Sequence, residues 1–89
     1  MNQDIPDHKV LEVCREIRQT LGFKKLSLIS VFKTIDSKNL GMINLGQFTR
    51  GINQILTVSG PILEKLFNIM DTNQIGMIDY NRFAQIIKI

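Results

Sequence analysis

The chain has 89 residues, of which 44% are hydrophobic and 7% aromatic, so it is long enough to fold as one small domain with a thin core. A single cysteine, Cys14, excludes an internal disulfide framework, and no apolar run is long enough to span a membrane. The net charge of +3 comes from scattered Lys and Arg residues, which is a weak indication of nucleic-acid binding. Together these properties favour an intracellular, globular protein.

The first predicted element is an amphipathic helix that ends near Gly22, a residue suited to a C-cap. Asp4, Pro6 and Asp7 form a typical helix start, because acidic residues and proline are favoured there. The apolar stripe that follows consists of Val10, Val13, Cys14, Ile17 and Leu21. We expect this segment, residues 1–23, to pack against the rest of the chain. Three interpretations are open: a built-in ligand of a groove, an ordinary core helix, or the exit helix of a preceding unit.

A repeat covers the rest of the chain. Shifting the sequence by 35 positions, from Gly41 to Gly76, aligns many identical residues. The identical pairs are Leu28/Leu63, Phe32/Phe67, Asp36/Asp71, Gly41/Gly76, Met42/Met77, Ile43/Ile78, Phe48/Phe83 and Ile52/Ile87. A period of roughly 20–50 residues indicates a repeated supersecondary unit, and two copies suggest a pair packed face to face.

Each unit is predicted to contain a helix, a twelve-residue loop and a second helix. The entering helices carry apolar stripes at Leu28, Val31, Phe32 and Ile35, and at Leu63, Leu66, Phe67 and Met70. Each stops at an Asp, and a Gly five positions later suits a turn with positive φ. The second unit begins at Ser59, a conventional N-cap, and ends in a helix of about two turns over residues 82–89.

This plan resembles the EF-hand family, the calmodulin superfamily of paired helix–loop–helix units. The resemblance implies an all-α fold of four helices, with the extra N-terminal helix added to them. It also implies a short two-stranded bridge in which Ile43 and Ile78, at loop position 8, face each other. The implied boundaries are 26–57 for hand one, 59–89 for hand two and 24–89 for the pair.

The first loop, which starts at Asp36, lacks most of the ligands that the resemblance would require for calcium. A calcium loop supplies oxygens from positions 1, 3, 5, 7, 9 and 12, and position 12 is a bidentate Glu. Here position 3 is Lys38, position 5 is Leu40 and position 12 is the neutral Gln47. Asn44 at position 9 is a further vestigial ligand, and we expect no metal in this loop.

The second loop keeps more oxygens, at Asp71, Asn73 and Asp79. However, Ile75 removes the ligand at position 5, and Arg82 places a positive charge at position 12, where it has no acceptor atom to offer. We therefore expect neither metal nor cofactor. Arg82 could instead pair with Asp71 or Asp79 and replace the charge of the ion, although an exposed pair contributes only about 0–1 kcal/mol.

Position 5 is apolar in both loops, and two interpretations are open. Leu40 and Ile75 either plug the space that an ion would fill, gaining about 1.5–3 kcal/mol each if fully buried, or are exposed loop residues, which are common on protein surfaces.

Catalysis has little support in the sequence. His8, Cys14 and Ser59 are far apart in the chain, and no motif pairs a nucleophile with a base. We expect a non-catalytic protein in which Cys14 is a small core residue and His8 is solvated.

The resemblance implies a calcium-independent interaction or structural module that is cytoplasmic and that docks a partner helix or a cytoskeletal or ciliary component. Its groove would use the stripe positions that line the pocket in relatives, namely Ile35, Ile52, Ile55, Leu66, Met70, Ile86 and Ile87. No membrane partner is expected. Two alternatives remain: a weak residual calcium sensor through loop 71–82, and a basic domain that binds nucleic acid or acidic surfaces.

Overall fold

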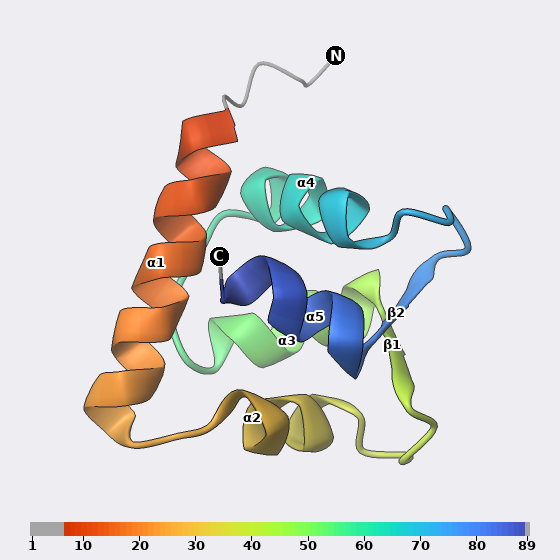
Figure 1. Ribbon diagram of the computed structural model, residues 1–89, viewed down its shortest axis with the longest axis horizontal. Helices are drawn as coiled ribbons and strands as arrows, with labels where there is room; N and C mark the ends of the chain where they lie inside the picture. Colours follow the sequence, from red (N-terminus) through yellow and green to blue (C-terminus); the bar gives the residue numbers. More distant parts are fainter. Residues whose placement is uncertain (1–6, 89) are drawn as a thin grey trace.

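The computed structural model describes residues 7–88, which form five α-helices and a small two-stranded antiparallel sheet (Figure 1). In chain order the elements are α1 (Asp7–Lys24), α2 (Leu28–Ile35), β1 (Met42–Asn44), α3 (Leu45–Asn53), α4 (Gly60–Met70), β2 (Met77–Asp79) and α5 (Tyr80–Ile87). The described part of the chain is therefore mostly helical. Asp4 and Pro6, which were expected to begin the first helix, lie outside the described residues, as does Ile89.

Four short helices form a closed ring around the core. Helix α2 packs on α3 and α5, and α4 packs on the same two helices. Five aromatic side chains of these helices form a continuous series of contacts through the core, in the order Phe67, Phe48, Phe83, Phe32 and Tyr80. Neighbouring ring centroids in this series lie 5.6–6.3 Å apart, a distance at which tilted and edge-on aromatic pairs attract. All four helices thus share one core.

The two strands join the units at one end of the molecule. Ile43 in β1 pairs directly with Ile78 in β2, and Met42 and Asn44 pair with Asp79 and Met77. Both isoleucine side chains are fully buried. The bridge between Ile43 and Ile78 that the resemblance implies is therefore present, in antiparallel register.

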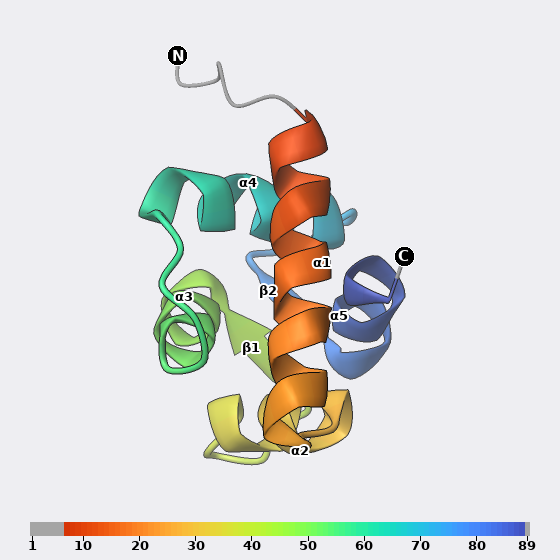
Figure 2. The same ribbon diagram turned by 90° about the vertical axis from the view of Figure 1, so that its left-hand side faces the viewer.

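Helix α1 covers the opposite end. Figure 1 shows the strands on the right and α1 on the left, and in Figure 2 α1 runs across the near face with α3 on one side and α5 on the other. Helix α1 packs on α4 and α5. Its predicted stripe is buried throughout, at Val10, Val13, Cys14, Ile17 and Leu21, and belongs to the same core cluster as the ring of helices.

The end of α1 differs from the prediction. Gly22 is not the C-cap, because the helix continues to Lys24 and Lys25 adopts the left-handed conformation (φ 59°). The N–H of Leu26 donates to the carbonyl of Leu21, and that of Lys25 donates to the carbonyl of Gly22. These two bonds form a Schellman motif, which satisfies the last carbonyls of the helix without a glycine at its turn.

Two helix starts differ in detail from the predictions. Helix α4 begins after Ser59 as expected, but the Ser59 side chain makes no capping hydrogen bond. Helix α5 begins at Tyr80, two residues before the predicted start at Arg82. The reason is Asp79, whose carboxylate accepts the N–H of Arg82 at 2.9 Å and so serves as the N-cap.

Helices α2 and α3 approach each other closely at Gly51. A Cβ atom added to Gly51 would overlap the side chain of Ile35 and lie 2.6 Å from its Cδ1. In the repeat, Gly51 stands where the second unit has Ile86. The first unit thus uses a missing side chain to bring its two helices together.

We expect the Gly51→Ala substitution to lower the free energy of unfolding by about 1–3 kcal/mol, because Ile35 must move to admit the methyl group. Gly22→Ala is the matched control, since no atom lies within 4 Å of the added Cβ, and it should raise stability by about 0.5–1 kcal/mol. Urea unfolding followed by circular dichroism measures both. Equal stability of the two variants would contradict the close approach.

Candidate functional site

The two loops adopt one conformation despite their different sequences. Position 4 is left-handed in both, at Asn39 (φ 58°) and Gln74 (φ 56°), and the glycines at position 6, Gly41 and Gly76, both have φ 83°. The positive φ predicted for these glycines is therefore present. The loops differ in their side chains and not in their backbone path.

Each loop is closed by its own first residue. Asp36 accepts the N–H of Leu40 at 2.9 Å and the N–H of Gly41 at 2.7 Å, one on each carboxylate oxygen. In the same way the two oxygens of Asp71 accept the loop's position-5 and position-6 N–H groups at 3.1 and 2.8 Å. Both carboxylates are buried, with 6% and 7% of the residue exposed. Backbone donors thus satisfy the charged oxygens inside the protein.

The later loop positions serve as helix caps. Asn44 accepts the N–H of Gln47, and the Gln47 side chain accepts the N–H of Asn44, both at 2.9 Å. This capping box starts α3, as Asp79 starts α5. Gln47 therefore has a structural role at the position where a calcium loop would place its bidentate Glu.

The two apolar residues at position 5 do not plug the loops. Leu40 is 64% exposed and Ile75 is 60% exposed, so the interpretation as exposed loop residues is the one that the structure shows. Their backbone N–H groups point to Asp36 and Asp71, which leaves the side chains on the outside.

Arg82 does not replace the charge of an ion in the manner proposed from the sequence. Within residues 7–88 no ion pair joins Arg82 to Asp71 or Asp79. The hydrogen bond between Arg82 and Asp79 is made by the backbone N–H of Arg82. Arg82 therefore takes part in the N-cap of α5 through its main chain and not through its charge.

These residues do not fit a calcium ion. A small cavity of about 80 Å³ in loop two is lined by Asp71, Asn73 and Asp79, but Arg82 lines it too and would place a positive charge beside the ion. No group of three or more His, Cys, Asp or Glu residues in the described chain could hold a metal. Calcium requires 6–8 oxygen ligands, which neither loop supplies.

The expected partner groove is not open in this structure. Five of its seven positions, Ile35, Ile52, Leu66, Met70 and Ile87, are buried, and the other two, Ile55 and Ile86, are half-buried. Ile35 and Ile55 also line a cavity beside α2 and α3. Helix α1 packs on α4 and α5, and its apolar stripe lies in the same core cluster as the buried positions. Arg18 fixes this arrangement by donating to the carbonyl of Ile87 at 2.6 Å, and Lys65 pairs with Asp7 at 3.1 Å.

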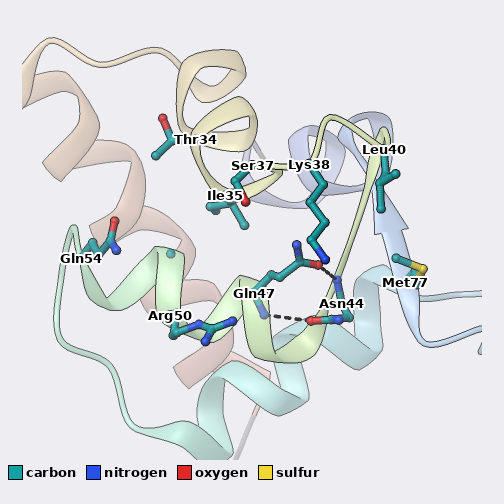
Figure 3. Close-up of a pocket in the computed structure, with 11 residues that line it drawn as sticks. Thr34, Ile35, Ser37, Lys38, Leu40, Asn44, Gln47, Arg50, Gln54 and Met77 are labelled. Carbon is teal, nitrogen blue, oxygen red and sulfur yellow. Dashed lines mark hydrogen bonds between the residues drawn. The ribbon is translucent and has the colours of Figure 1, made fainter.

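A hollow that the sequence does not predict lies between the end of α2, loop one and α3, although Ile35, Asn44 and Gln47 in its lining were candidate residues (Figure 3). Its volume is about 470 Å³, and its lining includes Lys38 and Arg50 but no Asp or Glu. Gly51 lies in its floor. The one available signal was this glycine, because it interrupts the apolar stripe that the repeat would otherwise carry there.

The candidate nucleophiles and the histidine have different surroundings in the structure. Cys14 is buried, and this burial raises the pKa of its thiol, although the positive charge of Arg18 partly opposes the shift. A buried thiol with a raised pKa is a poor nucleophile. His8 lies on the exposed side of α1, and Ser59 precedes α4.

A scan against models of protein families finds no match to this chain, and a search of the curated proteins finds none. In the described part of the chain, no helix has the length and apolar character needed to cross a membrane.

Helix α1 should contribute to the stability of the whole domain. Ile17→Ala should lower the free energy of unfolding by about 2–5 kcal/mol, because Ile17 is fully buried against the other helices. Leu11→Ala on the exposed side of the same helix should change it by less than about 0.5 kcal/mol. Chemical denaturation measures both. An unchanged stability of the Ile17 variant would mean that α1 is not part of the core.

Closure of loop two by Asp71 should contribute to stability without calcium. Asp71→Asn should cost about 1–3 kcal/mol of stability in the presence of a chelator, because an amide offers only one acceptor to the two N–H groups. Asn73→Ala, at an exposed position of the same loop, should be neutral within about 0.5 kcal/mol. Thermal unfolding with and without calcium measures both. A loss that appears only when calcium is present would contradict closure by Asp71.

Proposed function

We propose that the chain is a degenerate EF-hand pair that acts without calcium as a constitutive, non-catalytic protein-interaction module. The observation that carries this proposal is the closure of both loops by Asp36 and Asp71 on their own backbone N–H groups. The antiparallel pairing of Ile43 with Ile78 supports it further. A loop that closes on its own donors needs no ion to hold its shape.

Helix α1 is the built-in occupant of the pair in this proposal. In this proposal its buried stripe takes the place of a partner helix. Its first residue, Asp7, pairs with Lys65, and Arg18 in its second half donates to the end of α5. An amphipathic helix in an apolar groove is a common mode of recognition. A partner must therefore displace α1 or bind an outer surface. We propose the second, in which α1 stays in place and the partner binds outside it. A cytoskeletal or ciliary assembly stays the proposed setting.

The proposal predicts that calcium has no effect on the protein. Titration to about 1 mM calcium, the weak end of the affinity range for such loops, should leave the amide NMR signals of Gly41 and Gly76 unshifted and the melting temperature unchanged. Saturable shifts at Gly76 would instead favour the residual sensor.

A variant of the same chain supplies the positive control. Ile75→Asp combined with Arg82→Glu restores the oxygens at positions 5 and 12 of loop two, beside Asp71, Asn73 and Asp79. Because the backbone conformation already suits a calcium loop in this proposal, the variant should gain saturable calcium-dependent shifts at Gly76. Failure of the variant to respond would contradict the assignment of the loop to this family.

A further inference from the structure

Two adjoining cavities form one groove along α2 and α3, which we call the α2–α3 groove. The larger cavity lies toward loop one and the smaller, of about 190 Å³, toward the start of α2. Both are lined by Thr34, Ile35, Gly51 and Gln54, so they are continuous at the point where the two helices approach most closely. At Gly51 the side chain of Ile35 occupies the space that a Cβ atom would take, so these two residues together line the place where the cavities join.

One end of the α2–α3 groove is apolar. Leu26, Val31 and Ile55 line it, and Leu26 is 42% exposed. The edge at Leu26 is set by the Schellman turn that ends α1, because the N–H of Leu26 is held by the carbonyl of Leu21. A side chain of a partner that covered this end would gain from removing apolar surface from water.

The other end is positively charged. Lys38 comes from loop one and Arg50 from α3, and neither side chain makes an ion pair or a hydrogen bond within residues 7–88. In Figure 3 Lys38 reaches from the loop toward the Asn44–Gln47 pair, and Arg50 extends from α3 in the direction of Gln47. Asp36, the acidic residue closest to Lys38 in the sequence, is buried and accepts hydrogen bonds from loop N–H groups. Two cations thus face solvent with no acidic residue lining their cavity.

We infer that the α2–α3 groove binds an acidic segment of a partner protein, with an apolar side chain at the Leu26 end and carboxylates at Lys38 and Arg50. This inference rests on the proposed function and names the surface and the chemistry of the partner. Arg binds carboxylates through paired hydrogen bonds, and Lys adds a point charge. The adjoining apolar end favours a peptide over a free anion. No aromatic side chain lines either cavity to stack on bases, which disfavours single-stranded nucleic acid.

The test uses the full chain and a defined probe, the acetylated peptide amide Leu-Leu-Gly-Glu-Asp-Glu, together with the same residues in reverse order. Amide NMR at low salt should show saturable shifts at Gly51 and Gln54 for one of the two orders, with a Kd below about 1 mM, and the affinity should fall as salt rises. A peptide with Gln and Asn in place of the acids should bind at least about tenfold more weakly. Absence of saturable shifts for both orders would overturn the inference.

Matched variants separate a built groove from general charge attraction. Lys38→Gln with Arg50→Gln should weaken peptide binding by about tenfold or more, and Leu26→Gln should weaken it through the apolar end. Lys9→Gln with Arg15→Gln removes the same charge from the exposed side of α1 and should leave binding nearly unchanged. Equal weakening by both pairs would overturn the inference, provided that the NMR spectra show every variant folded.

Two competitors test the other ligand classes. Neither inorganic phosphate nor a single-stranded oligonucleotide at the peptide's concentration should displace it, and displacement by either would overturn the inference in favour of a free-anion or nucleic-acid site. Failure of the peptide to bind, with no response to calcium, would reject the groove and leave the proposed function intact. Peptide binding that requires calcium would instead reject the proposed function.

Discussion

The direct pairing of Ile43 with Ile78 is the contact that places the other elements. Both side chains are fully buried at the centre of a three-residue register, and each strand continues without a break into α3 or α5. The register therefore fixes the direction in which these helices leave the bridge. Strands this short are not stable alone, so the bridge depends on the helices that bury it, while the helices depend on the bridge for their alignment.

Polar residues that would bind an ion in a calcium loop instead maintain the backbone here. Asp36 and Asp71 are satisfied by loop N–H groups, and Asn44 and Asp79 begin the exit helices. Buried carboxylates are costly unless such donors surround them. Neither loop has a carboxylate at position 5 or 12. The loop shape therefore depends on the carboxylates at position 1 and on the helix caps, including Gln47 at position 12 of loop one, which accepts the N–H of Asn44. This is the physical basis of the proposed metal-independent role.

Much of the architecture could be predicted because it follows from spacing. The apolar stripes and the repeat located the helices and the glycine turns, since each depends on local residue pattern. The pairing of Ile43 with Ile78 was an expectation from the family resemblance and not from the pattern alone. The end of α1 and the start of α5 could not, because Lys25 replaces the usual glycine and Asp79 caps earlier than the pattern suggests. The closed groove and the α2–α3 groove depend on tertiary packing, which periodicity does not encode.

The central claim is that the loops are closed by their own carboxylates and need no ion. Native-state hydrogen exchange of the Leu40, Gly41, Ile75 and Gly76 amides in the presence of a chelator tests it most directly, because these four groups donate to Asp36 and Asp71. The account predicts slow exchange, with an opening free energy close to that of global unfolding and no change when calcium replaces the chelator. Fast exchange in chelator that becomes slow with calcium would contradict it.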